Sequence, residues 1–434
     1  MKPNVAVVIL DTLRKDYFDN HFDWLPGTSY SRAFSPSHWT IPTHASLYTG
    51  FYPSELGVTA KSPALDCEPT TVAEALTRTG YRTRLFTTNP QIFVWDDWER
   101  GFDEVVPPSR IPPEADGTFK WNRFKSESSR DGWSLYVTGV LNCIRSEYPT
   151  LKSIRRGIQL SRGGTSRAGD LRRRISRTEF GDGGEFLLLN LMDSHTPYDP
   201  PKEYATVETP QSVTVAEGLA GGPSNPDTVR QAYDDAARYL THEYREIHEE
   251  LEPIFDYIIT LSDHGELLGE DGWWNHGIGL RPELCHVPLN VSGEGFPNET
   301  TDTQVSLVDI PTTIADLTGA DLTDGTRGVD LRSPPTDREL LTEFHGLLPF
   351  HRNQFERHNV ADRYDEFDEQ YDGVVTPDGY AYRTPEDGVT VLGKVSDPEQ
   401  TITEMRATVP YTASEAVEGV STDVEDRLHD LGYA

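Results

Sequence analysis

Short apolar runs recur along the chain, separated by longer segments with the periodicity of amphipathic helices. The first run, VAVVIL at residues 5–10, is continuous and β-branched, which is typical of a strand buried on both faces of a parallel sheet. Comparable runs occupy residues 82–86, 186–191, 257–261 and 287–291, and helical patterns occupy residues 71–79 and 228–251. Strands that alternate with helices predict an α/β fold with a doubly wound, mostly parallel sheet and helices on both faces.

Polar residues directly follow several of the predicted strands. Ligands of doubly wound sheets bind beyond the carboxyl ends of the strands. The residues that follow the runs are Asp11, Thr87 to Asn89, Asp193 to His195 and Ser262 to His264, so polar residues collect where a functional site is expected.

Two parts of the chain depart from this rhythm. Residues 107–178 are rich in Arg, Ser and Gly, and they predict either a surface excursion or a lid whose Arg side chains bind an anion. After residue 336 the pattern alternates with a period of two, which predicts a small antiparallel sheet, followed by a helix over residues 422–431. The expected organisation is a catalytic domain over residues 1–335 and a small subdomain over residues 336–434.

The formal net charge is −32, because 71 acidic residues outnumber 39 basic ones. Such a surface attracts water and cations and repels nucleic acid and anionic membranes. We interpret the acidity as adaptation to a high-salt interior, where screening shortens the range of self-repulsion. The alternative is an ordinary acidic cytoplasmic enzyme.

The three cysteines, Cys67, Cys143 and Cys285, are scattered and odd in number, which predicts a reducing compartment rather than a disulfide framework. No apolar segment is long enough to span a membrane. The expected location is the cytoplasm, and the sequence gives no indication of the oligomeric state.

Residues 40–53, TIPTHASLYTGFYP, are the most informative segment. Pro42 suits the first turn of a helix and Gly50 suits its end. Thr40 then lies at a helix N-terminus, where unpaired N–H groups and the helix dipole favour an anion. A hydroxyl there could serve as an ordinary N-cap or, bound to a divalent metal, as a nucleophile.

This segment resembles the sulfatase signature Cys/Ser-x-Pro-x-Arg, followed by Thr-Gly and Tyr-Pro. ILDTLRKD at residues 9–16 is similar to the family's first strand and metal-binding turn, and LSDHGE at residues 261–266 to its second metal strand. NLMDSHTPY at residues 190–198 resembles the family's His-x-Pro strand end. The resemblance implies an alkaline-phosphatase-like fold and an enzyme that acts on sulfuric or phosphoric esters.

Two residues depart from the sulfatase signature. Thr40 stands where sulfatases have the Cys or Ser that becomes formylglycine, and His44 stands in place of the Arg. Thr cannot become formylglycine, so a covalent ester on Thr40 must be hydrolysed or passed to an acceptor. That chemistry resembles that of alkaline phosphatases and phosphoglycerol transferases. It is compatible with a sulfate, a phosphate or a phosphonate ester as the substrate.

The resemblance implies one divalent metal ion held by Asp11, Thr40, Asp263 and His264. Oxygen ligands with one imidazole accept Ca²⁺, Mg²⁺, Mn²⁺ or Zn²⁺, and the sequence does not choose among them. By position, His276 is the general acid for the leaving group and His195 contacts the transferred group. Thr88 and Asn89 occupy anion-binding positions, and His44 takes over from the missing Arg.

The sequence therefore predicts a metal-dependent hydrolase that cleaves an anionic sulfate or phosphate ester, for example of a glycan, through Thr40. The alternatives are a phosphoryl or phosphoglycerol-type transferase acting on a glycan or lipid acceptor, and an inactive anion-binding pseudo-enzyme.

Overall fold

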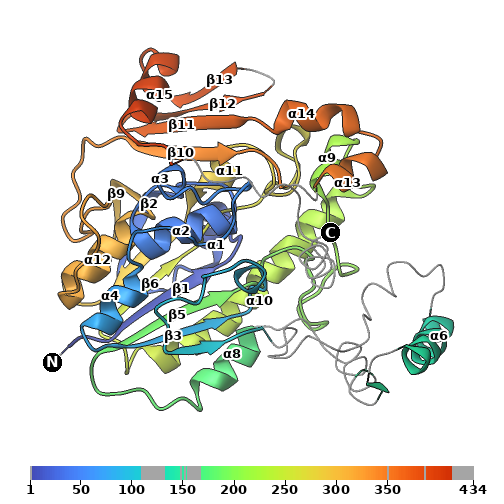
Figure 1. Cartoon of the computed structure of the whole chain (residues 1–434), viewed down its shortest axis with the longest axis horizontal. Helices are drawn as coiled ribbons and strands as arrows, with labels where there is room; N and C mark the ends of the chain where they lie inside the picture. Colours follow the sequence, from blue (N-terminus) through green and yellow to red (C-terminus); the bar gives the residue numbers. More distant parts are fainter. Residues whose placement is uncertain are drawn as a thin grey trace.

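The computed structural model describes residues 2–108, 132–146, 149–150, 153, 168–348, 351–385 and 388–412. Its main element is a nine-stranded mixed sheet with the order β4-β3-β5-β1-β6-β8-β2-β7, in which β9 pairs with β2 (Figure 1). The central strands β3, β5, β1 and β6 run parallel to one another, whereas β8 is antiparallel to both β6 and β2. The strands are β1 (Val5–Leu10), β2 (Thr28–Phe34), β3 (Arg82–Thr87), β4 (Glu104–Val106), β5 (Glu185–Leu191), β6 (Tyr257–Leu261), β7 (His286–Val287), β8 (Leu289–Ser292) and β9 (Glu299–Ser306).

Helices cover both faces of this sheet because alternate side chains of β1 enter different apolar cores. Val5, Val7 and Ile9 face a core shared with α2 (Thr40–Thr49), α4 (Val72–Arg78) and α12 (Asp309–Thr318). Ala6, Val8 and Leu10 face a core shared with α1 (Lys15–His21), α8 (Ala168–Ile175) and α10 (Pro226–Leu251). Every residue of β1 is buried, as its uninterrupted apolar run predicts.

A separate antiparallel sheet of four strands lies against the main body, with α15 (Pro398–Ala407) packed on it (Figure 1). Its strands, in spatial order, are β10 (Leu340–His345), β11 (Gln370–Thr376), β12 (Gly379–Thr384) and β13 (Gly388–Gly393). β10 is the strand nearest to α2 and to the short helix α3 (Pro53–Leu56) (Figure 1). The remaining helices are α6 (Gly132–Arg145), α9 (Val215–Leu219), α11 (Pro282–Cys285), α13 (His351–Arg357) and α14 (Tyr364–Phe367), with 3₁₀ turns at Gln91–Phe93, Glu270–Gly272 and Ala361–Arg363.

The predicted fold class is confirmed, with its mostly parallel sheet and its separate antiparallel sheet. The apolar run at residues 287–291 differs in detail, since Pro288 separates β7 from β8 and the strand is therefore broken. The helix predicted at residues 422–431 and most of the Arg-rich segment 107–178 lie outside the described residues. The division at residue 335 stays a prediction. Among the helices in the described ranges, none combines the length and the apolar character needed to cross a membrane.

Candidate active site

Asp11 follows β1 directly and is completely buried. Its Oδ2 accepts hydrogen bonds from Nδ2 of Asn89 (2.9 Å) and Nδ2 of Asn190 (3.1 Å), residues at the ends of the neighbouring strands β3 and β5. Its Oδ1 accepts one from the Thr12 hydroxyl (2.8 Å). These donors fix the orientation of the carboxylate.

Thr12 adopts the left-handed conformation (φ 65°), which is strained for a β-branched residue. In this conformation its backbone N–H donates to Oδ1 of Asp263 (3.2 Å), so the turn after β1 is tied to the end of β6. The strain is held in place by two buried strands, as is typical of functional turns.

Asp263 and His264 follow β6 and are both completely buried. Oδ1 of Asp263 accepts from the backbone N–H of His264 (3.0 Å), whereas Oδ2 makes no hydrogen bond within the described residues and lies 3.3 Å from Nε2 of His44. Burial raises the pKa of Asp263, but the charges of His264 and His44 outweigh it and hold the pKa well below its usual value. The carboxylate is therefore an anion.

Thr40 is the first residue of α2, and Trp39 occupies the N-cap position without a side-chain hydrogen bond. The Thr40 hydroxyl lies 3.3 Å from Nε2 of His264. Because Nδ1 of His264 donates to the Gly265 carbonyl (2.9 Å), Nε2 is the nitrogen that carries the lone pair when the ring is neutral, and it can then bind a metal ion. Thr40 is therefore not the N-cap of α2, and its hydroxyl adjoins His264.

One ligand atom from each of Asp11, Asp263 and His264 lies within 4.8 Å of the others. The donor set fits a divalent cation, since two carboxylates supply hard oxygens and an imidazole supplies a nitrogen ligand. Oδ2 of Asp263 fits as well, because it is buried and makes no hydrogen bond among the described residues, although Nε2 of His44 (3.3 Å) and of His264 (3.6 Å) lie near it. The Thr40 hydroxyl adjoins this cluster through His264.

His276 and His195 complete a row of imidazoles beside His264. The ring centroid of His276 lies 4.7 Å from that of His264 and 5.1 Å from that of His195. Burial lowers the pKa of His276, but the Glu266 carboxylate beside it outweighs burial and raises the pKa above its usual value. Burial and the charge of His276 lower the pKa of His195. The neighbouring imidazoles are therefore driven toward different protonation states.

Thr88 and Asn89 make protein contacts instead of pointing unengaged into a cavity. Asn89 holds Asp11, and the Thr88 hydroxyl donates to the Asn190 carbonyl (3.3 Å) and accepts from the backbone N–H of Met192 (3.0 Å). His44 lies on α2 with its ring completely buried beside Asp263. The structure thus gathers Asp11, Thr40, His44, Asp263 and His264 and joins His276 and His195 to them, while the catalytic and binding roles of all these residues stay predictions.

Sequence reasoning did not assign a role to Glu266 or Asn190. Glu266 stands in the Asp-His-Gly-Glu motif, and its completely buried carboxylate contacts His276 and Tyr198. Asn190 is a polar residue inside the apolar run of β5. A polar side chain at such a position was the available signal, because a buried strand rarely carries one without a partner.

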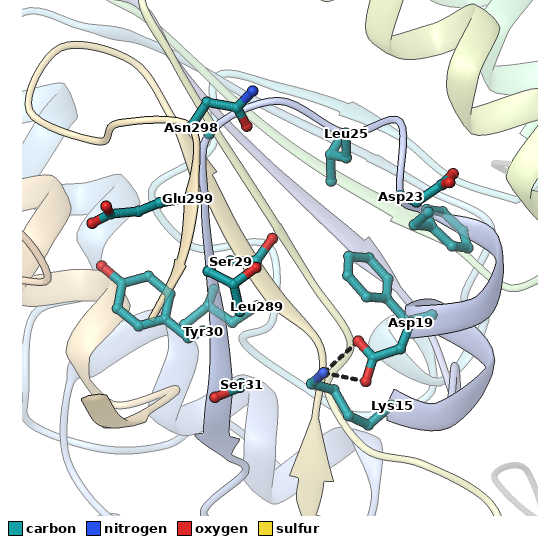
Figure 2. A pocket seen from close by; sticks show the side chains of 14 residues that line it. Lys15, Asp19, Asp23, Leu25, Ser29, Tyr30, Ser31, Leu289, Asn298 and Glu299 are labelled. Carbon is teal, nitrogen blue, oxygen red and sulfur yellow. Dashed lines mark hydrogen bonds and ion pairs between the residues drawn. The ribbon is translucent and has the colours of Figure 1, made fainter. Parts of the chain in front are cut away.

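A surface pocket of about 390 Å³ lies elsewhere, between α1 and the strands β2, β8 and β9. Figure 2 shows the Lys15 ammonium facing the Asp19 carboxylate. Nζ of Lys15 lies 2.6 Å from Oδ2 of Asp19. None of the predicted site residues lines this pocket. The candidate active site is therefore the buried cluster at the strand ends.

The mixed sheet and the buried cluster of Asp11, Asp263 and His264 define an α/β protein with a candidate metal site at the ends of its parallel strands. The sequence profile of the sulfatase family matches residues 3–320, and the chain belongs to this family. Sulfatase-family enzymes bind a divalent metal ion, in agreement with the cluster.

Individual relatives are distant. The low-salt glycan biosynthesis sulfotransferase of Haloferax volcanii is 25% identical over 357 residues, which cover 78% of this chain and 67% of that protein. An arylsulfatase of Clostridium perfringens is 22% identical over 76% of this chain and 78% of its own length. The structure of a phosphonate monoester hydrolase from Silicibacter pomeroyi has a TM-score of 0.61 at 18% identity, over 94% of each chain, and this likeness shows the shared fold.

Proposed function

We propose that the protein is a metal-dependent ester hydrolase that uses Thr40 as its nucleophile on a sulfate, phosphate or phosphonate ester. The observation that carries the proposal is the 3.3 Å contact between the Thr40 hydroxyl and Nε2 of His264, at the N-terminus of α2 and beside two buried carboxylates. The helix N-terminus favours the negative charge that develops on the nucleophile and on the transferred group.

Asp11, Asp263, His264 and Thr40 would hold the metal ion. When bound, a divalent ion neutralises charge on the transferred group and makes the Thr40 hydroxyl more acidic. Asn89, Asn190 and the backbone N–H of Thr12 hold the two carboxylates in place.

In the first step the Thr40 hydroxyl gives its proton to solvent water, and its oxygen forms a bond to the sulfur or phosphorus atom as the bond to the ester oxygen breaks. His276 gives its proton to the departing oxygen, and the resulting alcohol leaves. In the second step water forms the new bond to sulfur or phosphorus, the bond to Thr40 breaks, and His276 takes one proton of the water. Sulfate, phosphate or phosphonate is released, His276 is protonated again, and the Thr40 oxygen takes back a proton from solvent water to restore the hydroxyl.

A transferase is the second candidate, favoured by the similarity to a relative named as a glycan biosynthesis sulfotransferase. In that case a glycan hydroxyl takes the place of water in the second step. An anionic glycan is the substrate class that both candidates share.

We also propose that the protein works in a high-salt cytoplasm. The formal net charge of −32 and the three scattered cysteines support this.

The test compares wild-type protein with Thr40→Ala and Thr40→Ser on nitrophenyl sulfate, phosphate and phosphonate esters, with Mn²⁺ or Ca²⁺ added. We expect the alanine variant to lose turnover by about 10³-fold or more and the serine variant to keep part of it. Thr49→Ala is the matched control, because it removes a buried hydroxyl from the far end of the same helix.

Acid quenching followed by mass spectrometry should trap the covalent group on Thr40, and added glycan acceptors should shorten its lifetime only if the protein is a transferase. Equal turnover by wild type and Thr40→Ala would contradict the proposed nucleophile. A wild-type protein that binds sulfate or phosphate but turns over none of these esters would favour the pseudo-enzyme.

A further inference from the structure

Glu343 on β10 contacts the chain on both sides of the helix that carries Thr40. Upstream of α2, the backbone N–H of Glu343 donates to the Pro36 carbonyl (2.9 Å), and its carbonyl accepts from the Ser37 hydroxyl (2.8 Å). Downstream of α2, its carboxylate accepts from the backbone N–H (3.0 Å) and the hydroxyl (2.5 Å) of Ser54. One residue of the antiparallel sheet therefore fixes both ends of residues 36–54.

The Glu343 carboxylate is completely buried and fully engaged. Arg406 of α15 forms an ion pair with it and donates to the Ser54 hydroxyl (2.9 Å), and Nε2 of His345 lies 3.3 Å from Oε2. Removing one partner from a buried charged network costs far more than removing an exposed one, because the remaining groups lose their compensation. The network therefore holds its geometry tightly.

Further contacts also hold residues 36–54 in place. All ten residues of α2 are buried, and the Tyr52 hydroxyl accepts a further hydrogen bond from the backbone N–H of Leu341 on β10 (3.1 Å). Glu343 does not touch Thr40, so its influence on Thr40 passes through the backbone on either side of α2. A displacement of about 1 Å at a reacting group can cost about 10²-fold in rate.

We propose that Glu343 is a positioning residue that holds the Thr40 segment, residues 36–54, in register with the strand-end cluster. The antiparallel sheet is then a working part of the active site and not an appended subdomain. This inference rests on the proposed function in that Thr40 is the nucleophile.

The test uses the full-length protein with Glu343→Gln, which keeps the shape of the side chain and removes its charge. Val374→Ala is the control, because Val374 lies on the neighbouring strand β11 with its side chain packed toward Ile402 of α15. Each variant is compared by kcat, KM, melting temperature and hydrogen–deuterium exchange of the peptides that cover residues 36–54.

For Glu343→Gln we expect kcat to fall by about 10²-fold with KM within about twofold of wild type, and faster exchange across residues 36–54. Val374→Ala should lower the melting temperature at least as much as Glu343→Gln does. It should leave kcat and the exchange of residues 36–54 unchanged. Unchanged kcat and exchange in Glu343→Gln would overturn the inference. An equal loss of kcat in Glu343→Gln and Val374→Ala would overturn it as well.

The exchange measurement separates this inference from the proposed function. If wild type shows no Thr40-dependent turnover while exchange in residues 36–54 responds to Glu343→Gln alone, the holding role of Glu343 is supported and the nucleophile assignment fails. If Thr40 is labelled covalently but Glu343→Gln behaves as wild type, the nucleophile assignment is supported and the holding role of Glu343 fails.

Discussion

Nδ1 of His276 lies 3.1 Å from Oε1 of Glu266, and the other oxygen of that buried carboxylate accepts a hydrogen bond from the Tyr198 hydroxyl (2.8 Å). The pairing orients the imidazole and favours its protonated form, as carboxylates do for histidines in many catalytic sites. Burial raises the pKa of Glu266, but His276, His195 and Tyr198 outweigh it and lower the pKa overall. Both shifts favour the ionised forms of the pair.

Glu266→Gln should shift the pH dependence of turnover. A general acid works in its protonated form, so activity is present below the pKa of His276 and is lost as the pH rises through it. Removing the carboxylate charge lowers that pKa, and the alkaline limb of the kcat profile should move to lower pH. The control is Glu299→Gln, which changes an exposed carboxylate at the surface pocket. An alkaline limb at the same pH in wild type and Glu266→Gln would contradict this pairing.

The effect of His276→Ala should depend on the leaving group. Alkyl esters need protonation of the departing oxygen, so their turnover should fall by about 10²–10⁴-fold. Nitrophenyl esters leave as stable anions and should lose much less. Steady-state rates on a series of esters of graded leaving-group pKa would measure this difference. Equal losses across the series would exclude His276 as the general acid.

Asn89→Ala distinguishes between two roles of Asn89, which are holding the Asp11 carboxylate for the metal ion and contacting the anionic substrate. Its amide donates to Oδ2 of Asp11 at 2.9 Å, so its loss should weaken Mn²⁺ binding by about 10–100-fold in the absence of any substrate. The measurement is calorimetric titration of the apo-protein with Mn²⁺. Asn290→Ala is the matched control, because this buried amide donates to the Ser29 hydroxyl away from the site. Unchanged metal affinity with a raised KM would instead support direct contact with the anion.

The strand-end residues could be predicted because each follows an apolar run in the sequence. Asp11, Asp263 and His264 needed only the run and the rule that parallel strands end at one edge of the sheet. Strands β2 and β9 were not predicted because their sequences, TSYSRAF and ETTDTQVS, are rich in polar residues, and three of the eight residues of β9 are solvent-exposed. No local pattern distinguishes such segments from loops.

The contacts that hold the site residues could not be predicted from the sequence either. Glu343 contacts residues about 300 positions earlier, and its ion pair with Arg406 joins the edge of one sheet to a helix packed on it. A single sequence carries no signal for pairs at such separations. The orientation of Asn89 toward Asp11 likewise follows from the order of the strands, in which β5 pairs with both β3 and β1.

The melting temperature should rise steeply with KCl, because 71 acidic side chains face 39 basic ones and the compact state concentrates their repulsion. The Debye length shrinks from about 10 Å at 0.1 M to about 3 Å at 1 M salt, so most of the gain should come below about 1 M if screening is the cause. Asp96 and Glu99 are exposed carboxylates close together in sequence, and Asp96→Asn with Glu99→Gln should raise the melting temperature at low salt but not at high salt. Scanning fluorimetry in KCl and in choline chloride of equal ionic strength tests this. Two outcomes would show that self-repulsion does not limit stability: a melting temperature that is unchanged by either salt, or a double variant whose melting temperature rises equally at every salt concentration. The acidic composition would then have another origin.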